Sequence, residues 1–347
     1  MERDSPQPAI RYAGPIWTLL ILAPFLSEVL SGSTRFSFLF ALVPEIMVWG
    51  VGALLCRELA RRWCAGGASL LLLGLALSIA EEFVIQQTSL APLPWPGANG
   101  DYGRLLGVNW LYFLFMLGFE SVWVVLVPVQ VVELFFPNRS RQPWLRMRGL
   151  VVACTVFCLG SFIAWYSWTQ QALPKMLHVP PYHPPGVTIA IGVLAIVGLI
   201  ALAYLLRGFA LPGINSKRAT VHPLFAGLTA FILSGPWFVL ISMIFIPHHG
   251  IPLWMPLTGG VAWSLMALGV LLYWSASSRW SSLHRWATAL DATLACMIVP
   301  YLSIAGWSRS DVVAEILFDG LALAGFILLG RAVKKQLYTH PEPVSMQ

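Results

Sequence analysis

The stretch "GGASLLLLGLALSIAEEFVIQQ" (residues 66–87) contains the pattern on which the fold prediction rests. It begins as an apolar run long enough for a membrane helix, because about 20 such residues cross a hydrocarbon core of about 30 Å. Before the run ends, it places Glu81 and Glu82 side by side. The stretch therefore predicts a membrane span that carries two carboxyl groups at membrane depth.

Similar apolar runs recur along the whole chain. Of its 347 residues, 58% are hydrophobic and 10% are charged, whereas a soluble domain has roughly 25% charged residues. The mean hydropathy is +0.74. We therefore predict an all-α, polytopic transmembrane helix bundle of about ten spans, near residues 14–31, 37–56, 67–88, 106–135, 149–169, 187–206, 223–246, 252–274, 287–307 and 311–330.

The positions of Lys and Arg predict the orientation of these spans. Basic segments occupy every second connection: "RELARR" (57–62), "NRSRQPWLRMR" (138–148), "INSKR" (214–218), "SSRWSSLHR" (277–285) and "RAVKK" (331–335). Because cytoplasmic loops are enriched in Lys and Arg, we expect both termini in the cytoplasm and the protein in the cell inner (plasma) membrane. The chain is predicted to be a single integral membrane domain, with carboxylate-bearing helices in 1–137 and the remaining helices in 138–347.

The net charge of +6 fits cytoplasmic anchoring residues and contact with anionic lipid headgroups. No basic stripe is interleaved with base-stacking aromatic residues, so nucleic-acid binding is not predicted. The expected partners are the lipid bilayer and a membrane peptide, a small solute or an ion.

Polar side chains gather in the first four predicted spans. Ser78, Glu82 and Gln86 follow i, i+4 spacing on the third span and predict a polar stripe with Glu81 at its edge. Asn109 and Glu120 are eleven residues apart, about three helical turns, which predicts one face of the fourth span. Glu28 lies toward the outer end of the first span. These helices are predicted to aim carboxyls at one cavity that opens to the outer side.

Other acidic residues have a simpler interpretation. Glu58 lies within "CRELARR" and is expected to pair with a nearby Arg, and Glu133 is expected to pair with the "NRSR" loop. Glu45 follows Pro44, where a polar neighbour can satisfy a freed backbone group, so a structural and a functional role stay open for it.

Sequence motifs exclude several kinds of chemistry. The chain has no HExxH, no GxSxG and no P-loop. Its histidines at His178, His183, His222 and in "PHHG" (247–250) fall outside the spans that carry the carboxyls, so a zinc site is not evident. Cys154 and Cys158 are interpreted as packing residues. The sequence identifies no cofactor, and the metal requirement is unknown.

The adjacent glutamates resemble the first motif, EExxxR, of the CPBP family of CAAX-protease and bacteriocin-processing intramembrane proteins. In that family, FxxxH and HxxxN or HxxxD motifs follow, and the first Glu polarises a water molecule. The resemblance implies an intramembrane hydrolase with Glu81, Glu82 and Glu120 as catalytic residues. The chain departs from the family in placing Gln86 at the Arg position, in lacking His in "FMLGFE" (115–120) and in lacking the third motif.

A longer part of the chain resembles an uncharacterised family of bacterial multi-pass membrane proteins. The shared words are "LSEVLSGST" (26–34), "RELARR", the EE helix, "YGRLLGVNW" (102–110) and "VELFFP" (132–137). The resemblance implies a common membrane scaffold and no particular activity.

Three functions stay open at this point. In a CPBP-like hydrolase, Glu81 or Glu82 acts as general base and Glu120 and Asn109 orient the substrate. In a transporter, the same glutamates take up protons or a cation, with Glu28, Ser78, Gln86 and Asn109 as substrate-binding or ion-binding residues. In a non-catalytic scaffold, the protein binds lipid or a protein partner.

Overall fold

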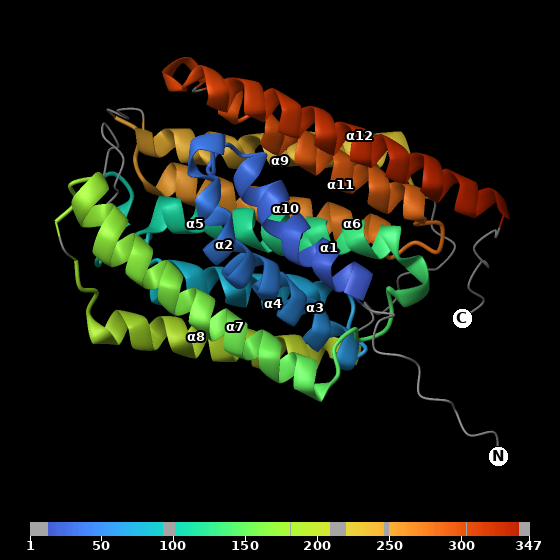
Figure 1. Ribbon diagram of the computed structural model, residues 1–347, viewed down its shortest axis with the longest axis horizontal. Helices are drawn as coiled ribbons and strands as arrows, with labels where there is room; N and C mark the ends of the chain where they lie inside the picture. Colours follow the sequence, from blue (N-terminus) through green and yellow to red (C-terminus); the bar gives the residue numbers. More distant parts are fainter. Residues whose placement is uncertain are drawn as a thin grey trace.

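The computed structural model describes residues 13–92, 101–180, 182–208, 220–245, 250–302 and 304–339. Within these ranges, ten helical stretches lie side by side in one bundle (Figure 1). Helix α1 begins and helix α12 ends at the same end of this bundle (Figure 1). The described chain therefore begins and ends at one end of the bundle.

The α-helices are α1 (Ala13–Pro24), α2 (Leu42–Glu45), α3 (Val51–Arg62), α4 (Gly67–Ala80), α5 (Trp110–Phe119), α6 (Val127–Phe135), α7 (Met147–Trp165), α8 (Gly186–Leu205), α9 (Pro223–Phe245), α10 (Trp254–Ser275), α11 (Ser282–Met297) and α12 (Arg309–Thr339). Several are continued or joined by π-helical segments: η2 (Phe25–Val29), η4 (Ile46–Gly50), η5 (Glu81–Ile85), η6 (Glu120–Leu126) and η8 (Tyr166–Met176). Short 3-10 helices are η3 (Phe36–Ala41), η7 (Pro137–Arg139), η9 (Leu206–Gly208), η10 (Pro300–Leu302) and η11 (Ile304–Gly306). Two short strands, β1 (Arg104–Leu105) and β2 (Val108–Asn109), pair antiparallel.

Eight helices in the described ranges are long and apolar enough to cross a membrane. They are Phe36–Arg62, Gly67–Ile85, Trp110–Phe135, Met147–Met176, Gly186–Gly208, Pro223–Ile244, Trp254–Ser275 and Arg309–Leu337. This architecture is that of an integral membrane protein, and it confirms the predicted helical, multi-pass class.

The two remaining predicted spans form shorter helices. The first, Ala13–Val29, is apolar. Near the predicted span 287–307, α11 starts earlier and has 16 residues. Its start is fixed by a capping box at Ser281 and His284, and Pro300, which has no backbone N–H, follows shortly after its end. Pro300–Leu302 and Ile304–Gly306 then form 3-10 turns in the second half of the predicted membrane span.

The carboxylate-bearing helices occupy the centre of the bundle. Within an 18-residue apolar window of the helix Gly67–Ile85, 67% is buried inside the protein, whereas 6% is buried in the corresponding window of Trp254–Ser275. Peripheral helices such as α8 and α10 leave their apolar side chains exposed, as expected of surfaces that contact lipid. The central helices are therefore shielded by protein from the surrounding membrane.

Helix α4 and segment η6 approach each other closely within this centre. A Cβ atom at Gly74 would lie 3.1 Å from the Cα of Ser121, which is tighter than ordinary van der Waals contact. Because glycine has no side chain at this point, the two helices can pack backbone to backbone. This approach places η5, which continues α4, in the same region as Glu120, which begins η6.

The basic connections meet at one end of the bundle, which we call the basic end. The Arg57 guanidinium donates hydrogen bonds to the main-chain oxygens of Arg139, Ser140 and Gln142. Arg285, in the first turn of α11, pairs with Glu133 of α6. Three of the predicted cytoplasmic connections are thus in contact, while "INSKR" (214–218) lies outside the described residues.

Candidate functional site

Five glutamates of the first four helical stretches lie in or directly beside π-helical segments. Glu28 lies in η2, Glu45 precedes η4, Glu81 and Glu82 begin η5, and Glu120 begins η6. We call these five residues the carboxylate cluster. Single π-turns within α-helices are rare and occur frequently at functional sites, so their coincidence with the acidic residues marks this region as a candidate site.

The charges of the cluster interact across helices. Glu120 interacts with Glu82, Glu81 and Glu28. Glu81 interacts with Glu82 and Glu28, and Glu28 with Glu45. The structure therefore brings together the carboxyls that the sequence placed on the first, third and fourth helices. Their assignment to catalysis or to ion binding stays a prediction.

Glu81 and Glu120 are buried without hydrogen bonds to their carboxyl oxygens. Each side chain is 1% exposed, and within the described part of the chain none of their four carboxyl oxygens has a hydrogen-bond partner. A buried ion without a partner costs several kcal/mol. A carboxyl group in these surroundings is stabilised when it takes up a proton or a cation.

Glu82 has very different surroundings from its neighbour Glu81. Thr88 Oγ1 donates to both Glu82 carboxyl oxygens at 2.8 Å, and Ser89 Oγ donates to Oε2 at 2.5 Å. These two hydroxyls were not among the predicted site residues. Their signal in the sequence is weak, because they simply follow the end of the span as "TS" in "QQTSL".

Tyr112 is another member of the site that the sequence analysis missed. It is buried on α5, its electrostatic interactions reach Glu82 and Glu120, and its side chain bonds to Thr88. An aromatic residue inside an apolar helix gives no sequence signal of such a role. Tyr112 therefore connects Glu120 with Thr88, one of the two residues whose hydroxyl groups donate hydrogen bonds to Glu82.

One of the two carboxyl oxygens of Glu45 has a hydrogen-bond partner among the described residues. Thr34 Oγ1 donates to Glu45 Oε1 at 2.5 Å, whereas Glu45 Oε2 is buried without a partner. The structure thus gives this residue one structural hydrogen bond and one free acceptor, and both roles considered for it stay open.

Ser78 lies beside Glu120, and its hydroxyl donates to the Met116 carbonyl at 3.1 Å. Gln86 follows η5, and its side chain is only partly buried. The predicted polar stripe of Ser78, Glu82 and Gln86 stays a prediction.

The predicted helical face shared by Asn109 and Glu120 is wrong. Helix α5 begins at Trp110, so Asn109 lies before it as the N-cap residue. Its Oδ1 accepts from the Tyr112 backbone N–H at 2.9 Å, and its Nδ2 donates to the Tyr102 carbonyl at 3.4 Å. Asn at this position satisfies an otherwise unpaired N–H group of the first turn.

The expected ion pair of Glu58 is confirmed. Glu58 Oε1 lies 3.1 Å from Arg57 Nη1, and its two oxygens also accept the backbone N–H groups of Trp144 and Leu145.

Glu133 also forms ion pairs, but with partners other than those predicted. It pairs with Arg61 at 2.7 Å, with Arg57 at 3.3 Å and with Arg285 at 3.3 Å. These arginines belong to α3 and to α11, whereas the prediction named the 138–141 loop. The residue that completes the set, Arg285, is too distant in sequence to be inferred from local charge patterning.

Within the described ranges, no group of three or more His, Cys, Asp or Glu side chains is arranged to hold a metal ion. His284 stacks on Trp280 and bonds to the Val221 carbonyl. His248 and His249 of "PHHG" lie outside the described residues.

Comparisons with protein-family models, with curated proteins and with solved structures found no match for this chain.

Proposed function

We propose that the protein is a transporter in which proton uptake by the carboxylate cluster is coupled to movement of a small solute or ion across the membrane. The main support is the burial of Glu81 and Glu120 with no partner on any carboxyl oxygen. Intramembrane acids of this kind form the proton relays of pumps and carriers. The π-helical segments supply local irregularity at the same residues.

The proposed topology has ten spans with both termini in the cytoplasm of the inner membrane. The placement of the start of α1 and the end of α12 at one end of the bundle supports an even number of crossings (Figure 1). The basic end would then face the cytoplasm, since cytoplasmic loops carry the excess of Lys and Arg.

Thiol labelling tests this orientation. Cys64 is exposed and directly follows α3 near the basic end. In a variant whose only cysteine is Cys64, a membrane-impermeant maleimide is expected to react only after the cells are permeabilised. A matched variant with Ser33→Cys as its only cysteine, exposed between η2 and η3, is expected to react in intact cells. The reverse pattern would invert the proposed topology.

Infrared difference spectroscopy tests proton binding by the cluster directly. Spectra of the protein in lipid at two pH values are expected to contain carbonyl bands of protonated carboxyls, and Glu81→Gln and Glu120→Gln should each remove one. Asp101→Asn, which changes an exposed carboxyl, is the control and should leave these bands unchanged. Difference bands that are unchanged by both glutamine substitutions would show that Glu81 and Glu120 do not exchange protons.

Proteoliposome measurements separate transport from the other proposals. Internal pH is followed with a trapped dye while candidate solutes and cations are added outside. Solute-dependent proton flux that is lost in Glu120→Gln supports coupled transport. Carboxyl bands without any flux would instead favour a scaffold, and cleavage of a membrane peptide that requires Glu81 or Glu82 would favour a CPBP-like hydrolase.

A further inference from the structure

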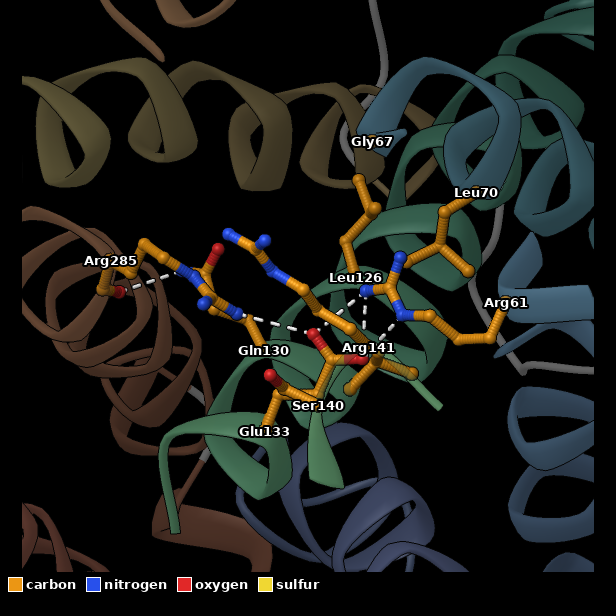
Figure 2. Close-up of a pocket in the computed structure, with 10 residues that line it drawn as sticks. Arg61, Gly67, Leu70, Leu126, Gln130, Glu133, Ser140, Arg141 and Arg285 are labelled. Atoms are coloured by element: carbon orange, nitrogen blue, oxygen red, sulfur yellow. Dashed lines mark hydrogen bonds and ion pairs between the residues drawn. The ribbon is translucent and has the colours of Figure 1, made fainter. Parts of the chain in front are cut away.

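A pocket of about 300 Å³ lies at the basic end of the bundle, between the end of α3, the start of α4, helix α6, the loop after α6 and the start of α11. Figure 2 shows Arg61 and Arg285 entering it from opposite sides, with Glu133 between them. Glu133 follows Glu120 by 13 residues along the same stretch, a rise of roughly 20 Å. The pocket is therefore separate from the carboxylate cluster.

Positive charge exceeds negative charge in this pocket. Three arginines, Arg61, Arg141 and Arg285, line it together with one acidic residue, Glu133. Glu133 is 3% exposed and shares its single negative charge among Arg57, Arg61 and Arg285. Because one carboxylate cannot neutralise this many guanidinium groups, the pocket favours a second anion.

The arginines are held in place before any ligand binds. Arg61 Nε and Nη2 donate to the two oxygens of Glu133 at 2.8 and 2.7 Å, and Arg285 Nη2 donates to Glu133 Oε2 at 3.3 Å. A guanidinium has five N–H donors, and Arg61 uses three of them, since its Nη1 also donates to the Ala65 carbonyl at 3.2 Å. Glu133 thus acts as a support that positions two cationic side chains.

Arg141 completes the set from the pocket's rim. It is exposed and has no hydrogen bond or ion pair within the described part of the chain. Figure 2 shows its guanidinium over the pocket, on the side of Arg285. Arginine forks match the oxygens of a phosphate group in geometry and in charge.

The start of α4 adds to this preference. Gly67, the first residue of α4, lines the pocket, and its N-cap residue Gly66 provides no side-chain cap. The first N–H groups of an α-helix lack intrahelical partners and carry partial positive charge. A Cβ atom at Gly67 would meet nothing within 4 Å, so open space lies beside this helix end.

The remaining polar lining does not compete for the anion. The Gln130 amide group donates to the Arg285 carbonyl at 2.6 Å and to Thr288 at 3.3 Å, and the Ser140 hydroxyl donates to the Pro137 carbonyl at 2.8 Å. Leu70 and Leu126 supply apolar wall. Recognition therefore depends on the arginines and on the helix end.

We infer that this pocket, lined by Arg61, Arg141, Arg285 and the start of α4, binds a phosphate group. The phosphate belongs to the headgroup of an anionic lipid or to a free phosphate ion. Both sources present the same tetrahedral oxygens to the arginines. Basic pockets between membrane helices on the cytoplasmic side are known to receive lipid headgroups.

The test uses the full-length protein and two designed substitutions. Gly67→Asp places a carboxylate in the open space at the first turn of α4, where the helix dipole favours negative charge, so the fold should be retained while the anion is excluded. Arg141→Gln removes the rim cation. The matched controls are Gly67→Ala and Arg148→Gln, because Arg148 is an exposed arginine of the same segment that does not line the pocket.

Native mass spectrometry with phosphatidylglycerol or with phosphatidylcholine measures binding of a lipid headgroup. Thermal unfolding with inorganic phosphate, compared with sodium chloride at equal ionic strength, measures binding of the free phosphate ion. We expect binding to weaken about tenfold in Arg141→Gln, as for loss of a hydrogen bond to a charged group, and to be abolished in Gly67→Asp, with both controls unchanged. Selective retention of phosphatidylglycerol identifies a lipid headgroup, and stabilisation by phosphate alone identifies the free ion.

The inference is overturned if wild-type protein and Gly67→Asp bind both probes equally. It is also overturned if Arg148→Gln weakens binding as much as Arg141→Gln, since the attraction would then come from the general positive charge of this end of the bundle.

Discussion

At the basic end, Glu58 and Glu133 are buried as deeply as Glu81 and Glu120 of the carboxylate cluster, yet the surroundings of the two pairs are opposite. Glu58 and Glu133 are each bonded to two or more arginine or backbone N–H groups. In the described part of the chain, the carboxyl oxygens of Glu81 and Glu120 have no hydrogen-bond partner. The comparison teaches that burial of an acid in a membrane bundle does not by itself indicate function. What distinguishes the candidate site is the lack of a compensating cation.

The largest loss of stability is expected when the ion pairs at the basic end are broken. Arg57 is fully buried, bonds to three carbonyls of the 139–142 segment and lies 3.4 Å above the Trp144 ring. Arg57→Met leaves Glu58 and Glu133 with fewer partners and should lower the free energy of unfolding by about 3–5 kcal/mol. Thermal unfolding of the protein in detergent measures this loss. The exposed Arg148→Met is the control, and an equal effect of both substitutions would refute the difference drawn between paired and surface arginines.

A smaller loss of stability is expected when Glu82 is replaced. Glu82→Gln replaces an acceptor of three hydroxyl bonds with an amide that accepts through only one oxygen, so stability should fall by about 1–2 kcal/mol. A double-mutant cycle with Thr88→Val measures the coupling between the two side chains. Additive effects of the two substitutions would mean that these hydrogen bonds do not hold Glu82.

Asn109 provides a test that separates local structure from the candidate site. Asn109→Ala removes the N-cap of α5 and should cost about 1 kcal/mol, whereas Asn109→Asp keeps a capping oxygen and should recover most of that stability. Neither substitution should change the carboxyl bands of Glu81 and Glu120 in infrared spectra. Loss of those bands in Asn109→Ala alone would show that Asn109 does contribute to the candidate site.

The smallest effect on stability is expected at the uncompensated glutamates. Glu81→Gln or Glu120→Gln keeps the shape of the side chain and removes a charge that has no partner, so the free energy of unfolding should change by less than about 1 kcal/mol or should rise. The same thermal unfolding assay compares them with Arg57→Met. A loss as large as that of Arg57→Met would show that these carboxyls are paired in the membrane.

Regular sequence patterns predicted the helical framework well. Runs of apolar residues gave the positions of eight membrane-long helices, because chain length and hydropathy alone decide whether a helix can cross the bilayer. The same reasoning misplaced the bounds of the predicted span 287–307, where α11 starts earlier and ends at Met297, and short 3-10 turns follow it. It also failed for Asn109, because helix capping depends on where the helix begins and not on spacing within it.

Side-chain partners were much harder to predict. The proximity of Glu28, Glu81 and Glu120 was expected from their helices, but the hydroxyl bonds of Glu82 and the place of Tyr112 were not. The π-helical segments were also unexpected, since no regular sequence period predicts a single wide turn.

The sequence by itself determined that this protein is a helical membrane protein with acidic residues inside its helices, because every backbone polar group in lipid must be bonded within the structure and apolar runs of this length do so as helices. Only the tertiary structure decided which acids are neutralised. Arg61 and Glu133 are 72 residues apart in sequence, and Arg285 and Glu133 are 152 apart. Electrostatic compensation acts over a few ångströms in space, and helix packing alone brings such distant residues within that range.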